Sequence, residues 1–176
     1  ESGRDIKVDA SGNAYMVGTA RSTQNIYISG GFQASLNGTT DAFITKVNSF
    51  GTRIFSTYYG GSQSEGYGLI SIDPNNLYVY LTGLTSSQDV IASSGQGLFI
   101  GGTTDHYIVK FANTGSRVFG KYIGGNSDEY GSLVTCISTN NPNFLQIYVA
   151  GETISNGSIA TPGTHQTALQ STLNTD

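Results

Sequence analysis

The chain has 176 residues, a net charge of −4 and only 11% charged residues, against 24 glycines and 11 tyrosines. Its eight Lys and Arg residues are scattered, which argues against nucleic acid or an anionic membrane surface as a partner. No apolar run approaches the roughly 20 residues that cross a bilayer. The single cysteine, Cys136, excludes an internal disulfide. Short bursts of aromatic and β-branched residues between glycines predict an all-β fold.

Strands are predicted from apolar and aromatic runs bounded by turn residues. In chain order, a turn at 9–13 is followed by an apolar strand at 14–17 and a long segment at 19–40. Four strands are then predicted at about 42–48, 53–59, 67–73 and 77–83. Asn and Gly between them supply the positive φ that tight hairpins need. Further long segments are predicted at 84–104 and 152–175.

An internal repeat organises these elements. Residues 41–64 match residues 105–128 at a constant offset of 64 without a gap, and a third, partial copy follows the same phase. The approximate units are 1–40 (partial), 41–104 and 105–176. The acids that recur in corresponding places are Glu1, Glu65, Glu129, Asp41, Asp105 and Asp176.

The long segments recur once per unit, and loops of about 20 residues usually carry function or local structure. We therefore expect segments 19–40, 84–104 and 152–175 to emerge on one face, which is the predicted recognition face. Four antiparallel strands in a repeat of this length are typical of a β-propeller blade. A β-sandwich is the alternative fold.

Three stretches carry a family resemblance: DAFITKVN at 41–48, FSTYYGG at 55–61 and VDASGNAYMVG at 8–18. Together they resemble SBBP repeats, the seven-bladed β-propeller repeats of bacterial secreted and cell-surface proteins. The resemblance implies a partial propeller of about two and a half to three repeats, located extracellularly or at the cell surface. It also implies that the remaining blades come from the same polypeptide or from neighbouring subunits. The family supplies no catalytic residues.

The recurring acids can be interpreted as rings that bind Ca²⁺ or as acid/base pairs. Because a residue that recurs in every unit serves the unit, we expect these acids to cap strands or accept turn amide hydrogen bonds. Asp9, Ser11 and Asn13 offer oxygen atoms at alternate positions, as a calcium loop does, but the closing bidentate Glu is missing. Hairpin chemistry is the preferred interpretation, and calcium is the one cofactor that stays open.

The remaining motifs have structural interpretations. His106 and His165 lack zinc spacing, and Cys136 stands where Val8 and Ile72 stand in the other copies, as a small apolar residue would. Gly60-Gly61 and Gly124-Gly125 have no helix and no Lys-Ser/Thr after them, so they predict tight turns and close contact between blades, not phosphate loops.

The sequence thus predicts a non-catalytic module for binding, adhesion or surface scaffolding, with protein or carbohydrate as partner and the long segments as ligand contacts. Exposed tyrosines that stack on sugars favour carbohydrate. One alternative is a polysaccharide-active hydrolase or lyase, which requires a carboxylate pair in a concave pocket. At least one of its acids should lie outside the repeat phase, as Asp89 and Glu152 do. The other alternative is a fibre-forming structural subunit.

Overall fold

The computed structural model describes residues 1–75, 77–95, 97–138 and 145–157. The described residues form ten β-strands and no helix, so the predicted all-β class is confirmed. No helix in these ranges is long and apolar enough to span a membrane. The strands are β1 (Ser2–Val8), β2 (Ala14–Ala20), β3 (Asp41–Val47), β4 (Arg53–Tyr59), β5 (Glu65–Ile72), β6 (Tyr78–Thr85), β7 (Asp105–Ala112), β8 (Arg117–Ile123), β9 (Glu129–Ser138) and β10 (Leu145–Thr153).

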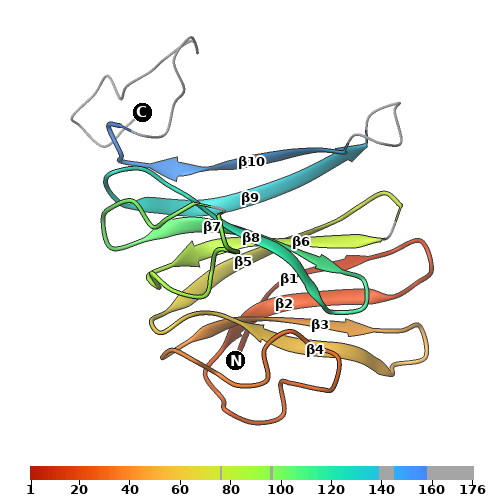
Figure 1. The fold of residues 1–176 in the computed structure, drawn as a ribbon. Coiled ribbons are helices and arrows are strands. Elements are labelled where there is room, and N and C mark those ends of the chain that lie inside the picture. Colours follow the sequence, from red (N-terminus) through yellow and green to blue (C-terminus); the bar gives the residue numbers. More distant parts are fainter. Residues whose placement is uncertain (76, 96, 139–144, 158–176) are drawn as a thin grey trace.

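The strands form two four-stranded antiparallel sheets and one two-stranded sheet. Their orders are β1-β2-β3-β4, β5-β6-β7-β8 and β10-β9. Figure 1 shows the three sheets stacked as layers in chain order. Each four-stranded sheet is a simple meander, as in a propeller blade. Asp41 opens β3 and Asp105 opens β7, so the two aspartates occupy equivalent places, as the repeat predicts.

The grouping of strands into sheets differs from the grouping into sequence units. β3 and β4 of the unit 41–104 pair with β1 and β2, whereas β5 and β6 of that unit belong to the second sheet. The long segments at 21–40 and 86–104 connect neighbouring strands of one sheet, and the short links at 60–64 and 124–128 pass from one sheet to the next. A repeat fixes the period of a structure but not where each sheet begins, which explains the difference.

The long segments protect the outer edge strands, β4 and β8. The Ile28 amide donates to the Ser56 carbonyl (3.1 Å) and the Tyr58 amide donates to the Gln33 carbonyl (3.2 Å). In the second sheet, the Ser93 amide donates to the Gly120 carbonyl (2.8 Å). A covered edge cannot template pairing with another chain. The length of these segments therefore has a local structural purpose as well.

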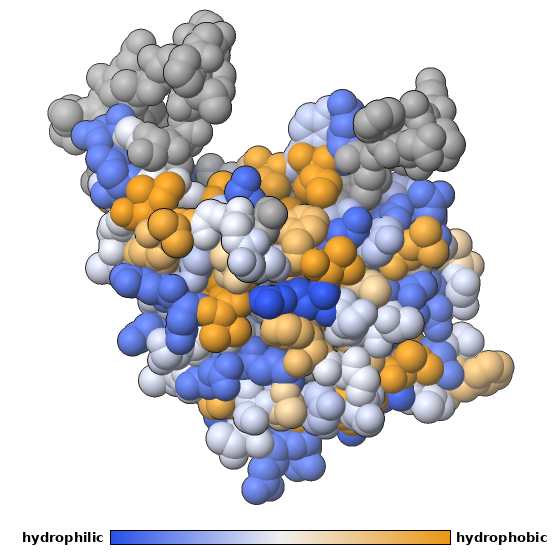
Figure 2. Space-filling model, in the orientation of Figure 1, coloured by the Kyte–Doolittle hydropathy of each residue, from blue (hydrophilic) through white to orange (hydrophobic). Residues whose placement is uncertain are grey.

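The core lies between the first two sheets and follows the alternation of strand side chains. Val79 and Leu81 of β6 belong to the cluster shared with the first sheet, while Tyr80 packs toward the third sheet. Tyr59 contacts Phe111 across the layers in an edge-to-face arrangement, with 5.8 Å between ring centroids. On the face seen in Figure 2, hydrophobic residues form separate small groups among hydrophilic ones.

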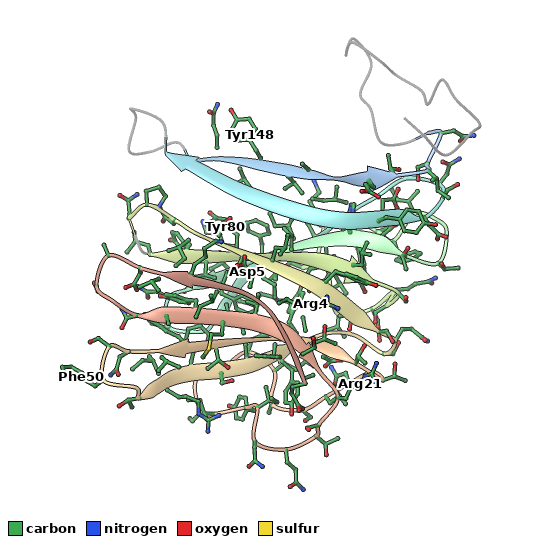
Figure 3. The ribbon with its side chains drawn as sticks, turned by 180° about the vertical axis from the view of Figure 1, so that it is seen from behind. Arg4, Asp5, Arg21, Phe50, Tyr80 and Tyr148 are labelled. Carbon is green, nitrogen blue, oxygen red and sulfur yellow. The ribbon has the colours of Figure 1, made fainter. Side chains whose placement is uncertain are left out.

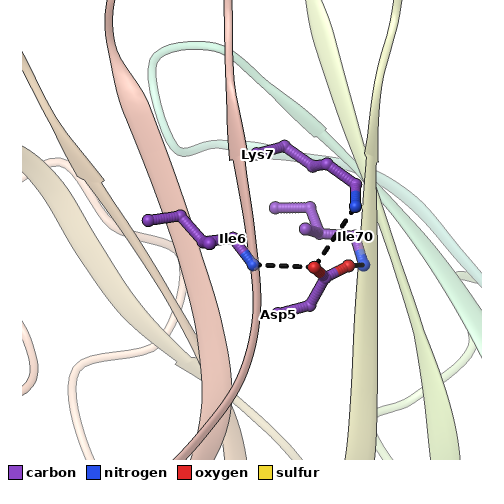
Figure 4. A network of polar contacts seen from close by, with 4 residues as sticks. All are labelled: Asp5, Ile6, Lys7 and Ile70. Carbon is purple, nitrogen blue, oxygen red and sulfur yellow. Dashed lines mark hydrogen bonds and ion pairs between the residues drawn. The ribbon is translucent and has the colours of Figure 1, made fainter.

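A polar contact also ties the first two sheets together (Figure 4). The Asp5 carboxylate on β1 accepts the backbone amide of Ile70 on β5 at 3.2 Å, and also the amide of Ile6 and the ammonium of Lys7. β5 is the edge strand of the second sheet, so its amide would otherwise lack a partner from a strand. Asp5 therefore fixes β1 against β5.

The two ends of the sheets are built differently. The tight turns at 9–13 and 48–52 lie at one end, and the long segments with the links between sheets lie at the other, which we call the loop end. Figure 3 shows Phe50 at the turn end and Arg21 toward the opposite side. The first two predicted recognition segments therefore start from the same end of adjacent sheets. Most of segment 152–175 lies outside the described residues.

Candidate ligand-binding site

A pocket of about 540 Å³ lies at the loop end, between the first and second sheets. Its volume is within the range of small-molecule sites. Two arginines and one aromatic ring line it, from Arg4 on β1, Arg21 after β2 and Tyr67 on β5. The serine and threonine residues in the wall are Ser2, Thr19, Thr40, Ser64, Thr85, Ser86 and Thr104. Several of these are the first or last residues of the long segments.

Arg4 and Tyr67 both sit at irregularities in the strands. The register of β1 against β2 shifts between Gly3 and Asp5, where Arg4 is the extra residue, and that of β5 against β6 shifts between Gly66 and Leu69. Bulges of this kind re-aim a side chain and are frequent next to binding sites. Here the two strand irregularities direct side chains from two different sheets into one pocket.

Tyr67 has a backbone φ of 58°, in the left-handed region that favours glycine. The corresponding residue of β9 is Gly131, with φ 55°. A non-glycine residue in this region costs roughly 1–2 kcal/mol, and such costs concentrate at functional sites. Since Tyr67 is 58% exposed, burial in the core does not explain why a tyrosine stands there.

The two arginines have few partners in the part of the chain that the structure describes. The Arg4 guanidinium carbon lies 5.0 Å from the centroid of the Tyr67 ring, a cation–π contact. Among the described residues, Arg21 has neither a side-chain hydrogen bond nor an ion pair. Both arginines lie on the side of the molecule shown in Figure 3. Neither recurs in the repeat, because Gly68 and Ser86 occupy their places in the next copy.

Two carboxylates also line the pocket, and both already accept hydrogen bonds. Glu65 is 1% exposed and accepts the Thr85 hydroxyl at 2.6 Å and the Gly61 amide at 3.0 Å. Burial raises the pKa of the Glu65 carboxyl above its ordinary value. Glu1 accepts the Ser22 amide at 3.0 Å. The two glutamates occupy repeat positions, so neither is an acid peculiar to this pocket.

The recurring acids form two buried pairs, each joining neighbouring sheets beside a link. In the first pair, Asp41 accepts the side-chain amide of Gln33 at 2.6 Å and the backbone amides of Asn37 (3.0 Å) and Gly38 (3.2 Å). Burial raises the pKa of Asp41. With Glu65 beside it, every oxygen of this pair has a donor. Asp176, the third aspartate of the series, lies outside the described residues.

The second pair, Asp105 and Glu129, is less well satisfied. One oxygen of Asp105 accepts the Ile100 amide at 3.1 Å, and one oxygen of Glu129 accepts the Gly125 amide and the Ser155 hydroxyl. Asp105 Oδ1 and Glu129 Oε2 are buried without a partner. Burial, together with the neighbouring Glu129, raises the pKa of Asp105 to about 7. Below that pH the Asp105 carboxyl is therefore protonated in the folded state.

The glycine pairs fit around these acids. A Cβ atom on Gly60 would collide with Glu65 and Asp41, and one on Gly124 would collide with Asp105 and Glu129. At these two positions, the predicted close contact between blades is a contact of the glycine with the paired carboxylates. The side chains that occupy the space are the recurring carboxylates, so glycine is needed wherever a pair is present.

The turn at 9–13 uses its own donors to satisfy Asp9. Asp9 Oδ1 accepts the backbone amides of Ser11 and Asn13, both at 2.9 Å, and the Asn13 side-chain amide reaches both carboxylate oxygens. These hydrogen bonds lower the pKa of Asp9 against the effect of burial. In the described part of the chain, no group of three or more His, Cys, Asp and Glu side chains is arranged so that it could hold a metal ion. The geometry is that of a hydrogen-bonded turn.

The other candidate residues lie away from the pocket. His106 on β7 is buried and donates through Nε2 to the Tyr130 carbonyl at 2.9 Å, which ties the second sheet to the third. Asp89 accepts the amide and hydroxyl of Ser62 in the link between sheets. Glu152 is an exposed residue of β10. Cys136 lies within β9, and His165 lies outside the described residues.

Sequence reasoning missed Arg4 and Arg21, although a signal was present. The two arginines break the repeat as clearly as the acids Asp89 and Glu152 do. No protein-family model matches the chain, and no curated protein matches its sequence.

Proposed function

We propose that this chain is a non-catalytic binding module of SBBP-like propeller blades that works outside the cell or at its surface, and that it binds saccharide in the pocket at the loop end. The observation that carries the proposal is the pair of arginines, Arg4 and Arg21, that line the pocket without serving the repeat. Neither arginine makes an ion pair or a side-chain hydrogen bond among the described residues. A binding site accounts for their presence.

The composition of the pocket wall supports a saccharide as ligand. Serine and threonine hydroxyls both donate and accept hydrogen bonds, as sugar hydroxyls do, and serine and threonine residues make up much of the pocket wall. Tyr67 adds an exposed aromatic ring, the kind of surface on which a sugar ring stacks. Propeller faces that carry the loops are a usual place for such sites.

A hydrolase or lyase is the second candidate function. It would need a carboxylate pair in the pocket with at least one acid outside the repeat phase, but the acids that line this pocket are Glu1 and Glu65, both in phase. A fibre-forming subunit is the third. It makes no use of an arginine-lined pocket, so the structure favours it less.

Binding to immobilised saccharides tests the proposal. Biolayer interferometry of the full chain against a panel of neutral and acidic oligosaccharides should find at least one binder, and Arg4→Ala/Arg21→Ala should lose it. Phe50→Ala, at the 90% exposed residue of the opposite end, is the matched control and should bind normally. Absence of binding, or binding that survives the double substitution, would overturn the proposal. Release of reducing ends from the same saccharides would favour the enzyme instead.

A further inference from the structure

We infer that the ligand of this pocket is an acidic saccharide, whose carboxylate is held by Arg21 and whose ring lies against Tyr67. This inference rests on the proposed saccharide-binding function and narrows its ligand class. It follows from the Arg21 guanidinium, which lines the pocket and has no ion pair or side-chain hydrogen bond among the described residues.

The Arg21 guanidinium is the group available for a charged ligand. It lines the pocket and has no ion pair or side-chain hydrogen bond within the described residues. A guanidinium presents a planar fork of N–H donors that matches the two oxygens of a carboxylate. A neutral sugar offers no equivalent acceptor pair, so this fork discriminates in favour of acidic sugars.

Arg4 contributes to binding of the same ligand in a different way. Its guanidinium lies over the Tyr67 ring at 5.0 Å, which holds both side chains in place before a ligand arrives. Such preorganisation reduces the entropy lost on binding. Since Arg4 comes from the first sheet and Tyr67 from the second, the stack also joins the two walls of the pocket.

The acids of the pocket do not cancel this positive charge at close range. The oxygens of Glu65 are buried and accept the Thr85 hydroxyl and the Gly61 amide. The Glu1 carboxylate accepts the Ser22 amide, and neither glutamate lies within ion-pair distance of Arg4 or Arg21. An incoming carboxylate therefore meets two guanidinium groups that no described carboxylate pairs with.

Calorimetry with matched sugars tests the inference. The full chain is titrated with digalacturonate and with the corresponding neutral digalactose, which differ only in the carboxylate groups. We expect digalacturonate to bind at least about tenfold more tightly, as removal of a charge-assisted hydrogen-bond pair implies. Arg21→Gln should abolish that preference, and binding should weaken as salt concentration rises.

The controls separate failure of the inference from failure of the proposed function. Equal affinity for both sugars, lost in Arg4→Ala/Arg21→Ala, would overturn the acidic ligand while the saccharide site stands. Absence of binding of either sugar, when the immobilised panel also shows none, would overturn both. Arg53→Gln is the matched arginine control, because Arg53 is engaged with the Asn25 carbonyl at 3.0 Å away from the pocket. A loss of preference in Arg53→Gln equal to that in Arg21→Gln would also contradict the inference.

Discussion

The junction between the first and second sheets and the junction between the second and third are built from the same repeat, yet they differ in two respects. The first holds a fully hydrogen-bonded carboxylate pair and a pocket lined by two arginines and a tyrosine. The second holds a pair with two unpartnered oxygens, and Gly131 replaces the tyrosine at the strand irregularity. The carboxylate pair is common to both junctions and belongs to the stacking of the sheets. The two arginines and the tyrosine are additions at the first junction.

Loss of a side-chain donor from the second long segment explains the difference between the carboxylate pairs. The Gln33 side-chain amide donates a hydrogen bond to Asp41 in the first junction, and glycine stands 64 residues later, at Gly97. Glycine has no side-chain donor. The second pair therefore depends on a proton where the first depends on amides.

The largest effect is expected from Asp41→Asn. The asparagine side chain has one acceptor oxygen in place of two, so at least one buried donor among Gln33, Asn37 and Gly38 loses its acceptor. We expect destabilisation by about 2 kcal/mol, measured by urea unfolding at pH 7.5. Thr45→Ala provides a reference at a buried hydroxyl pair of the same strand. An unchanged unfolding midpoint in Asp41→Asn would show that these hydrogen bonds contribute nothing.

The second junction should respond to pH, with a definite sign. The folded-state pKa of Asp105 is raised to about 7, whereas an unfolded aspartate titrates near 3.9. Between these values the folded state holds the extra proton, so stability falls as pH rises from about 4 to about 7. The raised pKa values of Asp41 and Glu65 act in the same direction.

Asp105→Asn is the variant that checks this pH dependence. Its amide can donate permanently to the unpartnered oxygen of Glu129, so thermal unfolding should become less dependent on pH between 5 and 8. The variant should be more stable than the parent at pH 8, by about 1 kcal/mol. Its saccharide binding should stay unchanged, because Asp105 does not line the pocket. A parental pH slope in the variant would exclude Asp105 as its source.

A smaller change in stability is expected from substitution of a β-branched residue that adopts a positive φ. Val90 has φ 64°, and Asn25 holds the corresponding place in the first sheet with φ 66°. In both sheets an arginine of the edge strand donates to the carbonyl of this residue. Val90→Asn should stabilise the chain by about 1 kcal/mol, as measured by thermal unfolding. Asn25→Val should destabilise it by a similar amount. If both variants proved less stable than the parent, the strain argument would be refuted.

The smallest change in stability is expected from Tyr67→Gly. Relief of the left-handed strain and the entropic cost of glycine are each about 1 kcal/mol and oppose one another, so the unfolding midpoint should barely move. Saccharide binding should weaken about tenfold, because the stacking surface and its contact with Arg4 are lost. A large loss of stability with normal binding would mean that Tyr67 serves the blade stack.

The strands could be predicted from the sequence because their signals are local. The predicted strands at 53–59 and 77–83 correspond to β4 and β6 within two residues, since aromatic and β-branched runs end at Asn, Gly and Pro turns. The pairing of strands into sheets could not be derived in this way. It depends on which connection crosses between sheets, and the short link at 60–64 does so while the long segment at 19–40 does not.

The pocket was less predictable, for a physical reason. Arg4 and Tyr67 enter it through strand irregularities, and the positive φ of Tyr67 has no signature in a tyrosine. The recurring acids were accessible to reasoning, because a residue repeated with the unit tends to serve the unit. The residues that break the repeat carry the information about binding, and only a comparison of the copies position by position reveals them.

The most direct test of the account is a map of where an acidic sugar binds. Titration of the ¹⁵N-labelled chain with digalacturonate should shift the backbone amides of Arg4, Arg21 and Tyr67 at the first junction. The amides of Tyr130, Gly131 and Thr153 at the second junction should not move. Shifts confined to the second junction, or spread equally over both, would contradict the claim that one junction of the repeat has become a binding site.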